Sequence, residues 1–327
     1  MKTIISKSRL ALAFLSACCV QLGTSSVQAQ GSWKPTRPVI IVVPFSPGGG
    51  IDATARAAAK QLSVIWGQSV VVENLPGADG VIGARRVIDS KQDGHTLLIQ
   101  APSLLLTKYT PDFSGPDPVT RLEPISIISK ASNAIVISGK LGAKTLPEFI
   151  QYCRTSATPC SFATGDVTGK FFSQKLIVEA GIPNAILVNY KGGGSLLADL
   201  MSNVVNVGFS GLYPTLPHHK RGTLKIMATT GLKRTAAVPD IPTALEAGLT
   251  EYISENWVAL FASKGTPPNI INGVADAVQE AVRDPETVKA IMGLSAEPIG
   301  STTAAFNTQL QDEVQRIAVM AKKYPLN

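Results

Sequence analysis

The sequence has no long apolar run beyond its first residues and little aromatic or charged character. Of its 327 residues, 6% are aromatic, 16% are charged and 45% are hydrophobic. That composition is typical of a globular protein and excludes an intrinsically disordered one. No stripe of Lys and Arg interleaved with aromatic residues occurs, so we expect no nucleic-acid partner. The chain is long enough for two ordinary α/β domains.

The one marked apolar run, Leu10–Leu22, is too short to cross a bilayer, which takes about 18 residues. It follows a basic segment, residues 2–9, and precedes Val27-Gln28-Ala29, which offers small residues where signal peptidase reads. We therefore predict that residues 1–29 are a signal peptide, cleaved after Ala29. The protein is expected to be exported to the periplasm.

A second interpretation of the leader stays open. Leu15-Ser16-Ala17-Cys18 also fits a lipoprotein box, in which Cys18 would be lipidated and become the mature N-terminus. We favour the soluble form, because the apolar run continues beyond Cys18 and a good cleavage site follows it.

Cysteine and histidine are scarce. Only Cys153 and Cys160 remain after the leader is removed, and in an oxidising compartment this close pair predicts a local disulfide. The three histidines, His95, His218 and His219, show no metal-ligand spacing with these cysteines. We expect neither a metal nor a cofactor.

The basic excess is mild. The formal charge is +7, but the leader carries three basic and no acidic residues, so the mature chain has 27 basic and 23 acidic residues, or +4. The short cluster His218–Arg221 stands out, and we interpret it as a solvated surface in an exposed connection.

Short β-branched runs alternate with amphipathic helical stretches, which predicts parallel sheets covered by helices. Residues 107–124 are expected to form a long loop. Strands are expected at 39–43, 70–73, 96–100, 125–128, 134–138, 161–163, 185–188, 204–209, 224–229 and 257–261. Helices are expected at 52–65, 80–90, 146–156, 170–180, 195–201, 267–282, 285–294 and 303–323.

This order predicts two α/β lobes. Residues 30–127 and 252–327 would form a discontinuous first lobe, and residues 128–251 the second. A cleft between them would lie where the carboxyl ends of parallel strands meet.

Glycine-rich turns precede four of the expected helices. In the run Val39–Asp52, a buried strand leads through three glycines into a helix, so bare backbone amides and the positive end of the helix dipole are suited to an anion. A plain tight connection would explain this run equally well. The other three turns are Pro76–Gly80, Thr164–Gly169 and Tyr190–Ser195.

None of these turns completes a Walker A loop or a dinucleotide fingerprint. Ser46 and Ser195 have no evident histidine partner, and no nucleophile elbow of the Gly-x-Ser-x-Gly type occurs. We predict no catalytic residue.

A series of short motifs spans nearly the whole mature chain. They are Pro44–Gly50 with Asp52 and Arg56, Val72–Ala78 with Gly80 and Gly83, Asp93–Leu97, Tyr190–Gly193, Arg234, Val238–Thr243, Glu246–Gly248, Trp257 and Gly265–Pro267. In this order they resemble the Bug family, the periplasmic solute-binding receptors of tripartite tricarboxylate transporters.

The resemblance implies an α/β, two-lobed type II periplasmic-binding-protein fold with a ligand cleft between the lobes. It implies a non-enzymatic receptor that binds a small organic carboxylate and delivers it to the membrane permease subunits of a tripartite transporter. A monomer is the default expectation for a receptor that must close and reopen. Two alternatives are an orphan receptor that presents a carboxylate to a sensor protein and, more remotely, a periplasmic serine hydrolase using Ser46 or Ser195.

The resemblance also implies which residues bind the ligand. In the first lobe they are Phe45, Ser46, Gly48, Gly49, Gly50, Asp52, Gly80 and Ser103. In the second lobe they are Thr164, Gly165, Thr168, Tyr190, Lys191, Gly192 and Ser210. Asp52 is expected to cap the helix or brace the loop, because a bare carboxylate would repel an anionic ligand.

The second lobe departs from the family pattern at Val167, Phe171 and Asn189, and Asp166 and Lys170 give its first loop unusual charges. The family resemblance therefore says least about ligand specificity on the second-lobe side of the cleft.

Overall fold

The computed structural model describes residues 33–111, 113–190 and 193–326. The predicted signal peptide and the lipoprotein alternative at Cys18 lie outside these residues. Within them, no helix is both long and apolar enough to span a membrane.

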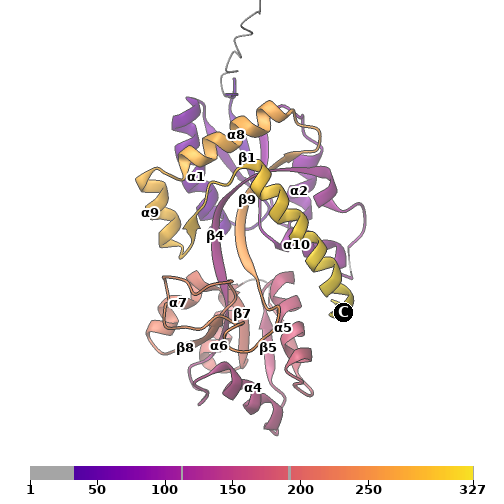
Figure 1. Ribbon diagram of the computed structural model, residues 1–327, viewed down its shortest axis with the longest axis vertical. Coiled ribbons are helices and arrows are strands. Elements are labelled where there is room, and N and C mark those ends of the chain that lie inside the picture. Colours follow the sequence, from indigo (N-terminus) through magenta and orange to yellow (C-terminus); the bar gives the residue numbers. More distant parts are fainter. Residues whose placement is uncertain (1–32, 112, 191–192, 327) are drawn as a thin grey trace, which may run out of the picture. The chain divides into compact units, whose positions relative to one another are not determined.

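The strands form one continuous sheet path in the order β2-β1-β3-β9-β4-β7-β5-β6, and β8 and β10 also pair with β4 (Figure 1). The strands are β1 (Val39–Val43), β2 (Val70–Asn74), β3 (Thr96–Gln100), β4 (Leu122–Ser138), β5 (Ser161–Thr164), β6 (Ile186–Asn189), β7 (Val207–Gly211), β8 (Leu224–Thr229), β9 (Glu255–Ser263) and β10 (Glu297–Pro298).

Parallel and antiparallel pairs both occur. β1 lies parallel to β2 and β3, and β5 lies parallel to β6 and β7. β9 runs antiparallel to β3 and β4, and β4 runs antiparallel to β7 and β8. The expected parallel sheets are thus present, and two antiparallel strands join them.

β4 changes partners along its length. It pairs with β9 up to Ser132 opposite Glu255, and with β7 from Asn133 opposite Gly211. The prediction of two separate strands at 125–128 and 134–138 is therefore wrong. The polar residues between them interrupt the apolar pattern, but their backbone groups still pair with neighbouring strands.

Helices cover both faces of each half of the sheet. They are α1 (Gly50–Trp66), α2 (Val81–Ile88), α3 (Ser103–Leu106), α4 (Leu146–Thr155), α5 (Val167–Glu179), α6 (Gly193–Ser202), α7 (Leu212–Lys220), α8 (Pro268–Ala281), α9 (Pro285–Gly293) and α10 (Thr303–Lys323). Short 3₁₀ helices among the described residues are η1 (Ala78–Gly80), η2 (Thr107–Tyr109) and η3 (Pro118–Arg121).

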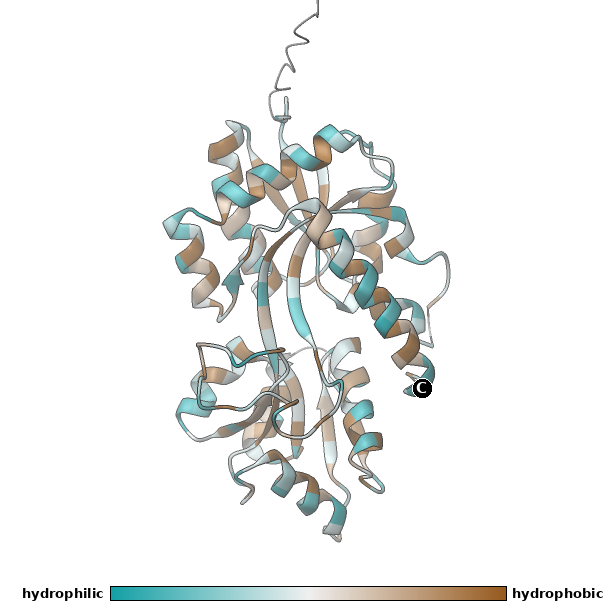
Figure 2. Cartoon of the chain, viewed as in Figure 1, coloured by the Kyte–Doolittle hydropathy of each residue, from teal (hydrophilic) through white to brown (hydrophobic). Residues whose placement is uncertain are grey.

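Alternation along β1 separates the two layers of the first half. Ile41 packs in the core with α1, α8 and α9, whereas Val42 packs in the core with α2, α3 and α10. Hydrophilic and apolar residues accordingly alternate along α10 (Figure 2). In the second half, Ile135 of β4 joins the core of α4 and α5, and Val136 joins that of α6 and α7.

Three local predictions need correction. α7 was not expected, because Pro214 and Pro217 argue against a helix, yet Leu212 and Thr215 are buried and packing outweighs the local preference. His218 and His219 therefore lie in the last turn of α7 rather than in an exposed connection. The expected loop at 107–124 contains η2, η3 and the first residues of β4.

The predicted disulfide is confirmed. Cys153, near the end of α4, is bonded to Cys160, just before β5, with their Cα atoms 5.5 Å apart. Both cysteines are buried.

Candidate functional site

Asp52 braces the loop between β1 and α1. Its side chain is buried, and Oδ2 accepts hydrogen bonds from the backbone amide of Gly48 (2.9 Å) and from Nε of Arg56 (3.0 Å). Burial alone would raise the pKa of Asp52, but the hydrogen bonds from Arg56, Gly48 and Asn74 outweigh it and lower the pKa. The carboxylate is thus charged and engaged on both oxygens, and its charge is compensated by Arg56.

Asn74, the last residue of β2, completes this brace. Its Nδ2 donates to Oδ1 of Asp52 (2.9 Å) and to the carbonyl of Phe45 (3.1 Å), and its Oδ1 accepts from Arg56 (3.0 Å). Side chains from two elements, α1 and β2, therefore fix one loop. The expected residues Ser46, Gly48, Gly49 and Gly50 are exposed on it, and Phe45 is half-buried.

The fixed loop presents the start of α1. Gly48 has φ +87°, a conformation that glycine adopts without strain, and Gly49 caps the helix in an extended conformation. The first amides of an α-helix, here beginning at Gly50, have no intrahelical acceptor and lie at the positive end of the dipole. This geometry is suited to a carboxylate.

Two buried donors lie at the end of β3. Gln100 is fully buried, and its Oε1 accepts from the amide of Ala101 (2.9 Å), but Nε2 has no partner among the described residues. The hydroxyl of Ser103 is likewise buried and unpartnered there. A buried polar atom without a partner costs about 1–3 kcal/mol, so it invites a functional explanation.

Gly80 packs closely against Gln100 and Pro44. A Cβ on Gly80 would lie 2.8 Å from Nε2 of Gln100 and 3.4 Å from Cβ of Pro44, so no larger residue fits without a shift. Sequence reasoning selected Gly80 and Ser103 but missed Gln100. A polar residue ending the apolar run Thr96–Gln100 was the available signal.

The first loop of the second lobe is capped by one of its unusual residues. Oδ1 of Asp166 accepts from the amide of Gly169 (2.7 Å), which fixes the start of α5. The hydroxyl of Thr164 donates to Oδ1 of Asn189 (2.9 Å), so Thr164 is buried and its hydroxyl is engaged. Gly165 and Thr168 are half-buried beside them.

The hydroxyl of Tyr190 is bonded within the protein, so we do not assign it to ligand binding. The hydroxyl donates to Oδ2 of Asp199 in α6 at 2.6 Å, and burial together with that carboxylate raises the pKa of Tyr190 to about 12. Its backbone amide donates to the carbonyl of Thr164 (2.8 Å), which ties the two loops together. Lys191 and Gly192 lie outside the described residues. Ser210, half-buried near the end of β7, is opposite Ala134 of β4.

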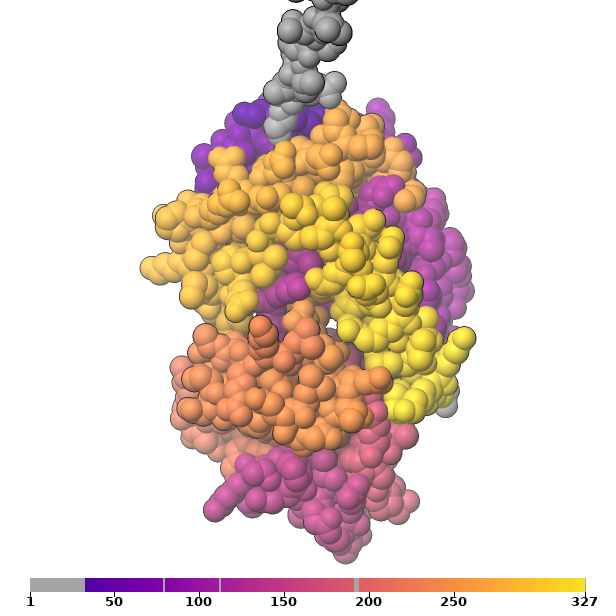
Figure 3. Space-filling model, viewed as in Figure 1, coloured from indigo at the N-terminus to yellow at the C-terminus, as the bar shows by residue number. Residues whose placement is uncertain are grey.

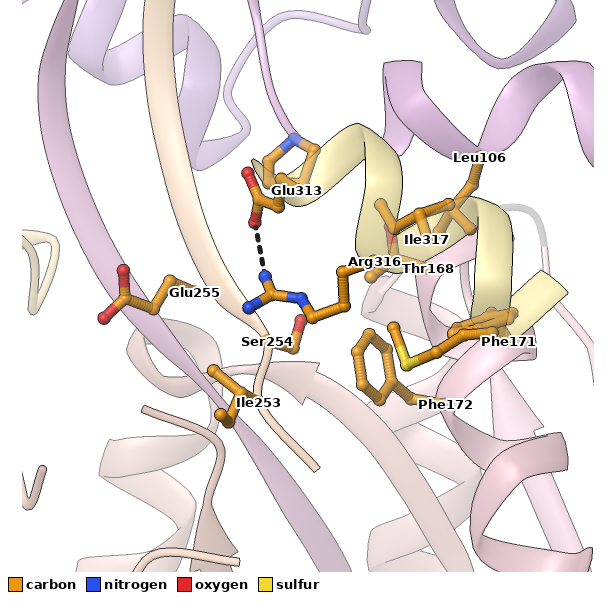
Figure 4. Close-up of a pocket in the computed structure, with 12 residues that line it drawn as sticks. Leu106, Thr168, Phe171, Phe172, Ile253, Ser254, Glu255, Glu313, Arg316 and Ile317 are labelled. Atoms are coloured by element: carbon orange, nitrogen blue, oxygen red, sulfur yellow. Dashed lines mark hydrogen bonds and ion pairs between the residues drawn. The ribbon is translucent and has the colours of Figure 1, made fainter. Parts of the chain in front are cut away.

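A small cavity lined by described residues reaches Thr168 of the predicted site. It has a volume of about 20 Å³, and residues of α10, α5 and the start of α3 line it, including Thr168, Pro102 and Arg316 (Figure 4). Arg316 points toward Glu313 of its own helix there, 3.4 Å away. The space suffices for one water and not for an organic acid.

A larger cavity of about 400 Å³ lies between α10, the strands β4 and β9, and the segment leading into β9. Figure 3 shows this hollow between α10, in yellow, and the orange residues opposite. Its charges are largely paired internally, with Lys130 bonded to Glu255 (3.2 Å). The predicted loop residues do not line it, so we place the candidate site at the strand-end loops instead.

No arrangement for nucleophilic catalysis is seen among the described residues. The ring of His95 contacts Asp93 and the amide of Thr36, and His219 accepts from the amide of Ile226. His218 contacts Arg221. The three histidines are therefore engaged away from Ser46 and Ser195.

The fold and its loops define a two-lobed periplasmic binding protein of the α/β class. Residues 54–326 match the family model of the tripartite tricarboxylate transporter family receptor, TctC. The chain belongs to this family, and the Bug-family resemblance is confirmed.

Comparisons with individual relatives support the same family assignment. Protein BugT of Bordetella pertussis is 31% identical over 294 residues, which cover 88% of this chain and 90% of BugT. The solved periplasmic binding protein BugD is 27% identical with a TM-score of 0.78, covering 90% of this chain and 99% of BugD. The R. palustris protein Rpa4515, solved with adipate, is 28% identical with a TM-score of 0.79, covering 88% of this chain and 97% of its own.

Proposed function

We propose that this protein is the periplasmic receptor of a tripartite tricarboxylate-type transporter, and that it captures a small organic carboxylate for the membrane permease subunits. The observation that carries the proposal is the loop braced by Asp52, which exposes the first amides of α1 at the end of β1. The family membership and the adipate bound to a relative support it. We propose no enzymatic activity.

The proposed ligand lies between two lobes, residues 30–127 with 252–327 and residues 128–251. The partner change of β4 between Ser132 and Asn133 supports a boundary close to 128. Closure over the ligand would use contacts from both lobes, because a ligand shifts a conformational equilibrium only through its differential affinity for the two states.

In the first lobe, one ligand carboxylate would accept hydrogen bonds from the amides of Gly49 and Gly50. Gly48 contributes the turn, since its amide already donates to Asp52. Nε2 of Gln100 lies beside Gly80, and this donor and the hydroxyl of Ser103 have no partner among the described residues, so both would be available to a ligand oxygen or an ordered water.

In the second lobe, Thr168, Gly165 and Ser210 are the proposed contacts, together with Lys191 and Gly192. Thr164 and Tyr190 are assigned a positioning role, because their hydroxyls bond to Asn189 and Asp199. Asn189, which departs from the family pattern, thus accepts the hydrogen bond that positions Thr164 in the second lobe.

The proposed function also requires that the protein be exported. We propose cleavage near Ala29 and a periplasmic location, which agrees with the periplasmic relative BugD. The disulfide between Cys153 and Cys160 is consistent with an oxidising compartment.

The test removes a single donor from the loop. Gly50 is the first residue of α1, the preceding Gly49 is extended, and a Cβ at Gly50 meets nothing within 4 Å. Proline fits such a first helical position and lacks only the N–H. Gly50→Pro therefore deletes one amide donor, and Gly50→Ala keeps it as the matched control.

Binding would be measured by calorimetry against mono-, di- and tricarboxylates, aromatic acids and acidic amino acids. We expect one class of acid to bind, Gly50→Pro to weaken its binding about 10- to 100-fold, and Gly50→Ala to leave it nearly unchanged. Equal binding by both variants would overturn the assignment of the loop. Binding of none of the acids by a protein shown by mass spectrometry to be ligand-free would overturn the receptor function.

A further inference from the structure

Five cations gather at the far end of the second lobe. The segment 139–144 meets the end of α7 and the start of β8 there: the amide of Gly139 donates to the carbonyl of Thr223 (3.0 Å), and a Cβ on Gly139 would lie 2.1 Å from the carbonyl oxygen of Gly222. We call the five side chains the basic patch. They are Lys140, Lys144, Lys220, Arg221 and Lys225.

Backbone carbonyls position two of these cations. Nζ of Lys225 donates to the carbonyls of Leu141 (2.7 Å) and Ala143 (3.2 Å), which ties β8 to the segment. Nζ of Lys140 donates to the carbonyl of Ser202 at the end of α6 (3.1 Å). Neutral carbonyls satisfy the ammonium groups without cancelling their charge.

The patch carries uncompensated positive charge. Among the described residues, none of its five cations forms an ion pair, although ten pairs of Lys or Arg with Asp or Glu occur elsewhere. The carboxylate of Glu148 contacts the patch only through the backbone amide of Lys144 (2.8 Å). Four of the five side chains are exposed and Lys225 is half-buried.

The patch is remote from the candidate ligand site. α7 begins at Leu212, directly after the strand end that carries Ser210, and the patch lies at the opposite end of this helix. In Figure 1, α7 and β8 lie side by side in the second half of the molecule. An occupant of the patch would therefore leave the ligand loops uncovered.

We propose that the basic patch binds the phosphate headgroups of an anionic lipid surface. A specific protein interface usually has an apolar centre, whereas a lipid headgroup layer requires little beyond complementary charge. Lys140 donates to the carbonyl of Ser202, and two residues further on lies Val204, an apolar side chain that is 67% exposed. A single apolar side chain at this edge does not form an apolar centre. Four of the five cations are lysines, point charges without the planar fork of arginine.

Such binding would hold the second lobe at the membrane that contains the proposed permease. The inference goes beyond the proposed function and rests on it only for which membrane is meant. Vesicle binding needs no carboxylate, so the two proposals fail independently.

The experiment measures co-sedimentation of the protein, purified from the periplasmic fraction, with vesicles of phosphatidylcholine that contain or lack phosphatidylglycerol. The test variant combines Lys140→Gln, Lys220→Gln and Arg221→Gln. A matched control with the same loss of charge combines Lys91→Gln, Lys289→Gln and Lys322→Gln, three exposed lysines outside the patch that form no ion pair among the described residues.

We expect binding to the anionic vesicles in about 0.02 M salt and its loss in about 0.5 M salt. Each cation near an anionic surface is worth roughly fivefold in binding, so the test variant should bind about 100-fold more weakly and the control nearly as the wild type. Carboxylate binding, measured by calorimetry, should be the same in both triple variants.

Three results would overturn the inference. They are no binding to anionic vesicles, equal weakening by both triple variants, and equal binding to neutral vesicles. Binding to poly-glutamate without binding to vesicles would also overturn it, and would assign the patch to an acidic protein partner.

Discussion

The hydroxyl of Tyr324 donates a hydrogen bond of 2.7 Å to Oε1 of Glu179, and so joins the end of the last helix to α5. The same oxygen receives the ammonium group of Lys175, a fully buried side chain that also lies over the ring of Tyr324, 4.9 Å from its centroid. Residues 145 positions apart thus share one buried polar cluster.

α10 consequently connects the two halves of the sheet. Near its start, Phe306 packs edge-on against Phe261 and Trp257 of β9, with ring centroids 5.2 and 5.5 Å away. Just beyond its end, Tyr324 is held by α5. Any closure that moves α5 relative to β9 must bend α10 or rearrange the cluster.

Tyr324→Phe should therefore destabilise the protein. The variant keeps the ring over Lys175 but removes one donor from the half-buried carboxylate of Glu179, which should lower the free energy of unfolding by about 1–3 kcal/mol. Urea denaturation measures the change. Tyr213→Phe is the control, because Tyr213 is 46% exposed, and equal losses in the two variants would contradict the role of the cluster.

Asp52→Asn should weaken the loop brace at neutral pH and not in acid. Because hydrogen bonds hold the pKa of Asp52 below its ordinary 3.8, its contribution to stability is full above that pH and is lost as the pH falls through the lowered value. At pH 7 we expect a loss of about 1–3 kcal/mol in the free energy of unfolding.

Denaturation curves of the wild type and Asp52→Asn across pH measure this difference. The stability gap should narrow below about pH 4. A gap that stays constant into strong acid would show that the amide disturbs the loop by shape rather than by charge. Carboxylate binding should weaken at pH 7 as well, since the amide of Gly48 loses its charged acceptor.

The sequence predicted well those features that depend on neighbouring residues. Val39–Val43 forms the expected strand because its apolar run is bounded by prolines and a glycine turn. Asp52 braces its loop as its position at the helix start suggested, and Cys153 bonds to Cys160 because the intervening chain is short.

Features that depend on distant packing could not be predicted in this way. Gln100 gains its significance from Pro44 and Gly80, which only the fold brings to it. α7 forms despite two prolines because it packs on β8. The contact between Tyr324 and Glu179 has no local signal at all, because it depends on where a long helix ends.

Removing the disulfide should lower stability without affecting the ligand site. Closing the short loop between Cys153 and Cys160 contributes about 2.5 kcal/mol in the chain-entropy model. The paired substitution Cys153→Ala and Cys160→Ala should lower the unfolding free energy by about this amount. Carboxylate affinity, measured by calorimetry, should remain unchanged because the bond joins α4 to the start of β5, the end opposite the ligand loops. A change in affinity with unchanged stability would contradict this assignment.

Glu313→Gln should stabilise the protein at neutral pH. Oε2 of Glu313 accepts from the indole nitrogen of the fully buried Trp257 at 2.6 Å, and burial raises the pKa of Glu313 despite that bond and the nearby Arg316. Since the fold favours the neutral acid, its contribution is full below the ordinary pKa of 4.5 and is lost as the pH rises through the raised value. Glutamine imitates the neutral acid and can still accept from Trp257.

The gain of Glu313→Gln over the wild type should therefore be largest at pH 7 and vanish toward pH 4. Urea denaturation at the two pH values measures it, and the emission of Trp257 gives an independent reading. That emission should shift with pH in the wild type and stay constant in the variant, because only the wild type changes the charge beside the indole. A variant less stable than the wild type at pH 7 would show that the ion pair with Arg316 outweighs the cost of burying the charge.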